Sequence, residues 1–255
     1  MNNQFEGELS QINPEVLIRR SGADPLGGFF LALGLIFNDI KGVMLLEELL
    51  TENFIKPKDD DVTTHAGNYS GILLQVNKLL ISIISEFFVF LKQNKEIFSS
   101  QEFGSVFKRL GKSDQRLWKN LIDASNSVTN VQSFLKTMFQ IRSNLAFHYD
   151  HSGKHLLSGY RSIFFGETKE RRNQFAFYSI GETLKLTRYY FSDAAAEESM
   201  HVIKGKRLKA ISRDSVDLKK YQEQVIQTIT VITISISKLM NTFIKFRRNQ
   251  GRVNE

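Results

Sequence analysis

Seven large apolar residues repeat near the carboxyl end of the 255-residue chain, with spacings that alternate between four and three. They are Val225, Ile229, Ile232, Ile236, Leu239, Phe243 and Phe246. This spacing puts all seven side chains on one face of a helix and is typical of a long helix packed lengthwise on others. Ile232, Ile234 and Ile236 also alternate as in a strand, but seven positions in one helical register outweigh three. The pattern predicts a long helix over residues 216–249.

Two earlier segments show similar apolar periodicity. In residues 68–98 apolar residues recur at intervals of three and four, and further apolar residues widen the stripe, so this helix is predicted to be the most buried. A looser pattern over residues 27–50 also favours a helix. All three prolines lie within the first 57 residues, so the rest of the chain lacks the strongest helix breaker. These observations predict an all-α helical bundle.

The predicted domain organisation follows from where the periodicity stops. Acidic, proline-containing residues 56–61 end the first helical pattern, which gives an N-terminal helical extension and acidic linker over residues 1–66. The bundle is predicted over residues 67–255. Within it, residues 151–215 carry glycines and aromatic residues without a clear period, so an irregular, partly helical insertion is expected there. Residues 188–200 suit a helix, and residues 174–180 suit a short hairpin.

The composition excludes several kinds of site. The chain has no cysteine, which excludes disulfides, thiolate metal sites and cysteine nucleophiles. It has no glycine-rich phosphate loop and no G-x-S-x-G or H-E-x-x-H motif. Kinases, nucleotide-dependent dehydrogenases, serine hydrolases of that type and zinc proteases are therefore disfavoured. No metal and no cofactor are expected.

Residues 1–10 show no signal-peptide pattern, and the longest apolar runs, residues 26–37 and 79–91, are shorter than the roughly 18–20 residues that a membrane span needs. We therefore expect a cytoplasmic protein that does not enter a membrane. The formal net charge of +7 is compatible with a polyanionic partner such as RNA. The basic clusters at residues 169–172, 204–209 and 245–252 also suit solvated loops and a basic helix end.

One apolar helical pattern ends in residues that suit chemistry. Arg142 and His148 are separated by five residues, with Leu145 midway between them. At about 100° per residue, the two polar side chains flank the line of Leu145. The apolar residues before them, among them Leu135 and Met138, predict a packed helix over residues 130–149.

This arrangement resembles the R-x(4–6)-H motif of the HEPN domain family. The position after the arginine, often Asn, Asp or His in that family, is Ser143 here, and Asn144 follows it. The resemblance implies a HEPN-like helical bundle and a homodimer with the motif helices at the interface. It also implies a metal-independent endoribonuclease that leaves a cyclic phosphate, such as a toxin or defence effector restrained by an antitoxin or other regulatory protein.

The residue types fit that chemistry. Histidine suits proton transfer because its reference pKa of about 6.5 lies near cellular pH, and the guanidinium fork of arginine holds two phosphate oxygens at once. One arginine and one histidine make half a ribonuclease site, and a two-fold dimer would supply a base and an acid together. We predict catalytic roles for Arg142 and His148, and substrate-binding roles for Asn144 and Tyr149.

Other interpretations of the same residues remain open. An arginine and a histidine at a helix end also bond the last carbonyls and favour the C-terminal dipole, which is a purely structural role. His151 and His155 follow His148 at metal-ligand spacing, but no cysteine and no close carboxylate pair accompany them. The alternative function is a non-catalytic HEPN-like helical module that binds nucleotide, RNA or a protein partner.

Overall fold

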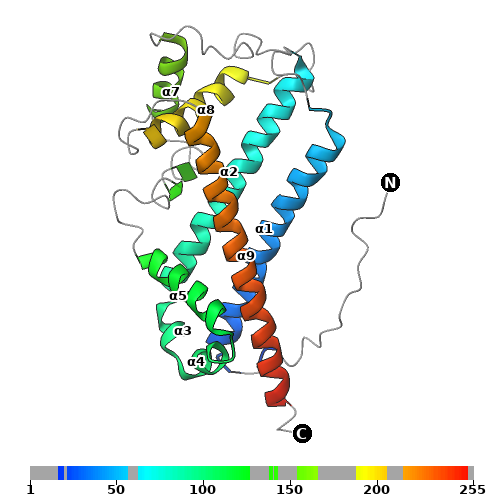
Figure 1. The fold of residues 1–255 in the computed structure, drawn as a ribbon, viewed down its shortest axis with the longest axis vertical. Helices are drawn as coiled ribbons and strands as arrows, with labels where there is room; N and C mark the ends of the chain where they lie inside the picture. Colours follow the sequence, from blue (N-terminus) through cyan, green and yellow to red (C-terminus); the bar gives the residue numbers. More distant parts are fainter. Residues whose placement is uncertain are drawn as a thin grey trace.

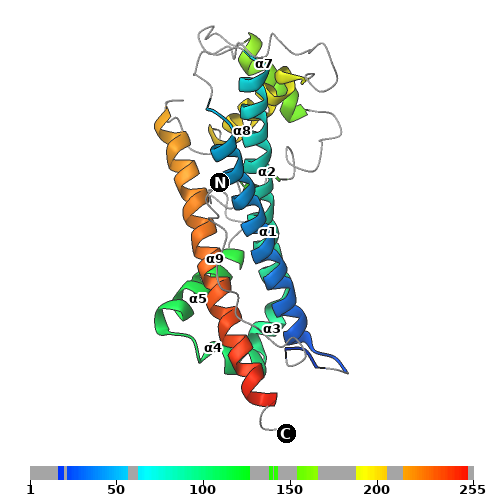
Figure 2. The same ribbon diagram turned by 90° about the vertical axis from the view of Figure 1, so that its right-hand side faces the viewer.

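Three long helices dominate the computed structural model, which describes residues 17–19, 22–56, 63–126, 138–139, 141–142, 154–165, 188–205 and 215–251. These helices are α1 (Pro25–Asn53), α2 (Thr64–Gln93) and α9 (Ser215–Gly251). They run along an elongated molecule, with α9 crossing the pair formed by α1 and α2 (Figure 1, Figure 2). Every regular element within the described ranges is a helix, which confirms the predicted all-α class.

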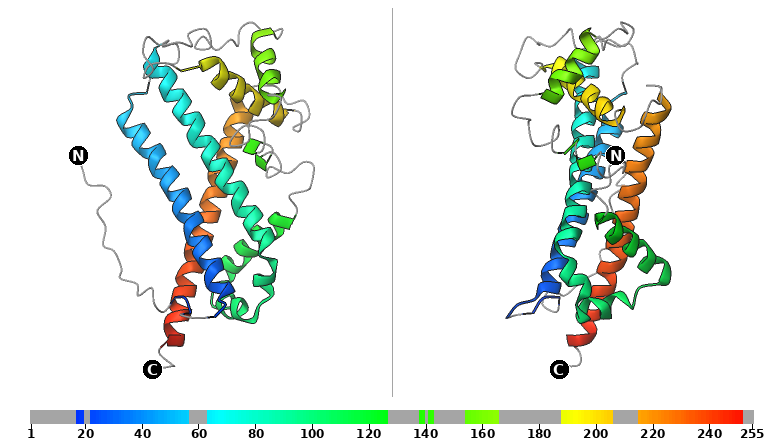
Figure 3. Two further views of the ribbon diagram at one scale, coloured as in Figure 1. Left: turned by 180° about the vertical axis from the view of Figure 1, so that it is seen from behind. Right: turned by 90° about the vertical axis from the view of Figure 1, so that its left-hand side faces the viewer.

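Shorter helices gather at the two ends of these three. Near the end where α9 terminates lie α3 (Lys95–Ser99), α4 (Gln101–Phe107) and α5 (Lys112–Asn126), and at the opposite end lie α7 (Lys154–Phe165) and α8 (Tyr190–Gly205) (Figure 3). Helix α8 confirms the helical segment expected over residues 188–200. The expected hairpin at residues 174–180 lies outside the described residues.

Polar caps fix where several helices begin. Asp24 precedes Pro25, and its carboxylate accepts a hydrogen bond from the Gly27 backbone N–H at 2.9 Å. Proline at the first helical position loses nothing, since that N–H has no partner within the helix. Thr63 caps α2 in the same way through the Ala66 N–H. These caps satisfy backbone donors that the helices cannot satisfy themselves.

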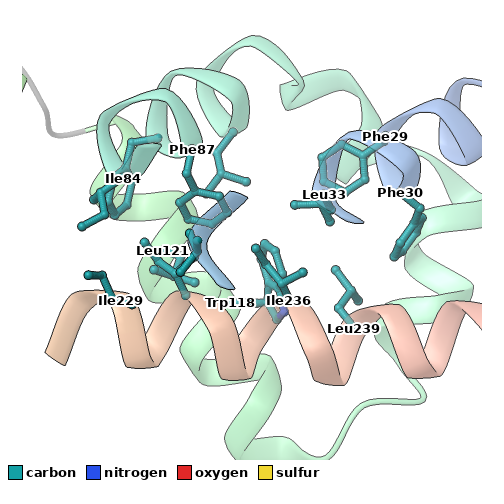
Figure 4. Close-up of a cluster of buried hydrophobic side chains, with 14 of the residues drawn as sticks. Phe29, Phe30, Leu33, Ile84, Phe87, Trp118, Leu121, Ile229, Ile236 and Leu239 are labelled. Carbon is teal, nitrogen blue, oxygen red and sulfur yellow. The ribbon is translucent and has the colours of Figure 1, made fainter. Parts of the chain in front are cut away.

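The core lies where α1, α2, α5 and α9 meet (Figure 4). All seven residues of the C-terminal repeat are buried, and four of them are fully or almost fully inaccessible. Trp118 of α5 is also fully buried, and its indole N–H donates to the Ser235 carbonyl oxygen of α9 at 3.0 Å. The hydrogen bond satisfies the one polar atom of an otherwise apolar side chain. Apolar packing and this directional hydrogen bond therefore both hold α5 against α9.

Helix α1 is an integral part of this core. The segment of residues 1–66 was predicted to be an extension ahead of the bundle. Leu26, Phe29, Leu33 and other residues of α1 nevertheless belong to the same buried cluster as α2 and α9. The ring of Phe30 stacks on that of Phe243 in α9, with centroids 3.9 Å apart. The first helix therefore packs on the last.

Among the described residues, α1 exposes more large apolar side chains than α2 or α9 does. Leu31 and Leu35 are 60% and 62% exposed, and Leu45, Leu46 and Leu49 are also exposed. By length and composition alone, three helical stretches among the described residues could cross a membrane: residues 25–53, 64–93 and 223–250. The uninterrupted apolar runs of residues 26–37 and 79–91 are too short for a membrane span, but the helices α1 and α2 that contain them are long enough. The expectation of a protein outside the membrane stays a prediction.

Candidate functional site

Part of the predicted motif helix is described. Residues 138–139 and 141–142 are helical, whereas His148, Asn144 and Tyr149 lie outside the described residues. The structure therefore places one of the four predicted site residues, Arg142. Whether it brings the arginine and the histidine together stays a prediction.

Buried neighbours hold Arg142 in place. Met138 and Ile141 are fully buried and belong to the main core, and Phe139 packs against that core. Met138 is one of the apolar residues from which the motif helix was predicted. Since Ile141 immediately precedes Arg142, the backbone of the arginine is anchored to the core. Its side chain is 26% exposed, so the guanidinium lies at the boundary between the core and solvent.

Arg142 forms an ion pair with Glu86 of α2, through one Nη nitrogen and one carboxylate oxygen. The Glu86 side chain is 50% exposed, so water weakens the attraction, and such a pair contributes little stability, about 0–1 kcal/mol. The Glu86 carboxylate contacts one Nη nitrogen of a guanidinium that carries five N–H groups in all. The pair therefore orients Arg142 and competes with any anion that approaches it.

Glu86 was not predicted as a site residue, although the sequence carries a signal for it. It is the one charged residue in the apolar run of residues 79–91, between buried Ser85 and Phe87. A carboxylate in such a run needs a partner or access to water, since burial of an unpaired charge is costly. The partner lies in a distant segment, and the sequence does not show which segment packs there.

A second polar cluster lies where α8 begins beside α2. The Arg188 Nε donates to a carboxylate oxygen of Asp193 at 2.6 Å, and both side chains are about three-quarters buried. The guanidinium lies directly on Gly71 of α2, where a Cβ would overlap it, and the Tyr190 ring lies on Gly67 in the same manner. The two glycines let α8 approach the backbone of α2 closely.

Lys78 of α2 completes the second cluster. Burial lowers the pKa of its ammonium group, the Asp193 carboxylate opposes that effect, and the Arg188 guanidinium adds to it. Burial raises the pKa of the Tyr190 hydroxyl, and the Arg188 charge acts in the opposite direction. The cluster thus holds two basic groups beside one carboxylate in a half-buried position.

The described residues contain no group of three histidine, aspartate or glutamate side chains that could hold a metal ion. The side chains of His148, His151 and His155 are not among those described. The expected lack of a metal site at the motif therefore stays a prediction.

Comparison of the chain with protein-family models, with curated proteins and with solved structures finds no significant match. The resemblance to the HEPN family thus rests on the sequence motif.

Proposed function

We propose that the protein is a metal-independent endoribonuclease of HEPN type, with a composite site made from Arg142 and His148 of two copies. The observation that carries this proposal is the position of Arg142, whose backbone is anchored by fully buried Ile141 while its guanidinium reaches the surface. An anchored, partly desolvated guanidinium suits phosphate binding better than a fully solvated one, because less side-chain freedom is lost on binding.

The proposed chemistry divides the roles between the two residue types. One histidine takes the proton from the RNA 2′-hydroxyl, and the histidine of the second copy protonates the departing 5′-oxygen. The 2′-oxygen attacks phosphorus and the bond to the 5′-oxygen breaks, which leaves a 2′,3′-cyclic phosphate. The arginines stabilise the negative charge that develops on the phosphate oxygens. Asn144 and Tyr149 are proposed to contact the RNA, and no metal or cofactor takes part.

The biological setting is proposed on the same resemblance. The protein is a cytoplasmic toxin or defence effector outside the membrane, and an antitoxin or other regulatory protein restrains it. The net charge of +7 supports RNA as the substrate, because a basic protein attracts a polyanion at long range.

The proposal predicts a homodimer in solution. One imidazole cannot act as base and acid in the same step, so the active species needs two copies of the motif. Sedimentation velocity at micromolar concentration should give the mass of two 29.3 kDa chains. Cleavage of RNA by a strictly monomeric species would contradict the composite site.

The second candidate function is a non-catalytic HEPN-like helical module, and the Arg142–Glu86 ion pair favours it. In that role Arg142 links the motif segment to α2 through Glu86 and does not bind phosphate. RNA, nucleotide or a protein would then bind without being cleaved.

Glu86→Gln separates the two candidates. If Arg142 binds phosphate, loss of the competing carboxylate should strengthen RNA binding by about two- to fivefold, the equivalent of a surface ion pair of up to about 1 kcal/mol. Binding is measured by fluorescence anisotropy in the His148→Ala background, so that the RNA stays intact. Glu48→Gln, at an exposed position on α1, is the matched control. A Glu86→Gln protein that is less stable, with RNA affinity equal to that of the control, would favour the structural module.

A further inference from the structure

The cluster at the start of α8 lies on the same side of α2 as Arg142. Lys78 and Glu86 are eight residues apart on α2, which corresponds to about 12 Å along the helix and about 80° of rotation. In Figures 1 and 3, helix α8 and the short helical segments of residues 138–139 and 141–142 lie along one side of α2. Helix α1 lies on the other side. Arg142 and Arg188 therefore contact α2 at different points along the same side of that helix.

The charges of this cluster are not balanced by the groups described around them. Arg188 uses Nε for Asp193, and within the described residues its two Nη nitrogens and the Lys78 ammonium group form no hydrogen bond. Two basic side chains thus stand beside one carboxylate. An anion that reached them would also oppose the effect of burial on the Lys78 pKa, because a nearby negative charge favours the protonated amine.

Packing against α2 fixes the position of the Arg188 guanidinium. It lies where a Cβ of Gly71 would be, so a side chain at that position would displace it. Arg188 is 23% exposed, so part of the group reaches solvent while the rest is fixed. A fixed guanidinium whose Nη groups have no partner among the described residues can hold two phosphate oxygens at once.

We infer that Lys78 and Arg188 form a phosphate-binding subsite for the backbone of single-stranded RNA, along α2 from Arg142. The inference rests on the proposed function, because it takes Arg142 as the position of the reacting phosphate. Lys78 and Gly71, on which Arg188 lies, are about 12 Å and about 22 Å along α2 from Glu86, so the midpoint of the subsite lies roughly five stacked nucleotides away at about 3.4 Å each along one strand. An RNA of six nucleotides reaches both positions, and a dinucleotide reaches one.

The test measures how tightly the full-length His148→Ala protein binds fluorescein-labelled RNA of six nucleotides, RNA of two nucleotides, and AMP, across a range of salt concentrations. Lys78→Met should weaken binding of the hexanucleotide and lower the slope of log Kd against log salt by about 0.7, the value for one lost contact to a single strand. Dinucleotide binding should weaken less than hexanucleotide binding, because a dinucleotide can occupy the Arg142 position alone. Asp193→Asn should strengthen hexanucleotide binding, because it removes the competing carboxylate. Lys41→Met, at an exposed position on α1, is the matched control.

Two other outcomes overturn the inference. If Lys78→Met and Lys41→Met have equal effects, or if Asp193→Asn weakens hexanucleotide binding in a protein that is still folded, the cluster only packs α8 on α2. If Lys78→Met weakens AMP binding as much as hexanucleotide binding, the site takes free phosphate groups rather than an RNA strand. Cleavage by the wild-type protein is measured separately. If the wild-type protein does not cleave RNA but Lys78→Met weakens hexanucleotide binding, the result supports the subsite and contradicts the proposed nuclease activity.

Discussion

Arg247→Met is expected to lower the free energy of unfolding by about 3–5 kcal/mol, the usual effect of removing one partner from a buried ion pair. Arg247 and Asp24 are each only 6% exposed, and an Nη nitrogen of Arg247 lies 2.7 Å from a carboxylate oxygen of Asp24. Arg247 also contacts Glu102 at 3.3 Å. Methionine has a similar size but leaves the Asp24 carboxylate buried without its cation. The loss is measured by urea unfolding.

Two further variants make this result specific. Arg248→Met changes the adjacent, exposed arginine and should shift the unfolding midpoint little. In the double variant Asp24→Asn with Arg247→Met, the buried charge is gone and asparagine can still cap α1, so much of the lost stability should return. Equal losses for Arg247→Met and Arg248→Met would show that the ion pair does not hold α9 against the start of α1.

The same pair predicts a pH dependence. Burial acts to raise the pKa of Asp24, but the backbone N–H groups of Gly27 and Arg19 and the Arg247 guanidinium outweigh it, so the pKa is lowered. The folded protein therefore binds this proton less tightly than the unfolded chain does. The stabilisation is complete above an ordinary carboxyl pKa of about 4 and is lost as the pH falls through the folded value. This acid loss should be smaller in the double variant.

His148→Ala should lower RNA cleavage by about 10²-fold or more, the usual effect of losing a general acid–base group, and should leave stability nearly unchanged. If His148 instead bonds the end of its helix, the same change should cost on the order of 1 kcal/mol of stability. Cleavage would then fall only as far as the folded fraction does. Thermal melting and cleavage are therefore measured on the same samples.

A His148→Ala protein that melts much earlier but cleaves normally per folded molecule would remove His148 from the site. Arg142→Ala is the companion variant, because the structure describes its surroundings and Glu86 is the partner that it would lose.

Apolar periodicity predicted the long helices well where they pack against several neighbours. The C-terminal repeat is buried at all seven positions, because a seam of large side chains needs partners along its whole length. The helix predicted over residues 68–98 instead ends at Gln93, and α3 begins at Lys95. Asn94 lies between them, and its side chain donates to the Phe90 carbonyl oxygen, an end that hydrophobic spacing alone does not reveal.

The candidate site was less predictable, because its contacts join distant segments. The motif showed Arg142 as a residue of interest, but its partner Glu86 depends on how the motif segment packs on α2. Likewise, Arg188, Asp193 and Lys78 come together only because Gly67 and Gly71 let α8 approach closely. Local spacing predicts which residues share a helix face, whereas tertiary packing decides which faces meet.

The most direct test of the central proposal is an RNA cleavage assay in excess chelator, with mass analysis of the product ends, for wild-type and His148→Ala protein side by side. The proposed function predicts that the wild-type protein cleaves without divalent metal and leaves 2′,3′-cyclic phosphate ends, and that the variant forms about 10²-fold less of this product or still less. Cleavage that requires metal, or equal amounts of cyclic phosphate from both proteins, would contradict it.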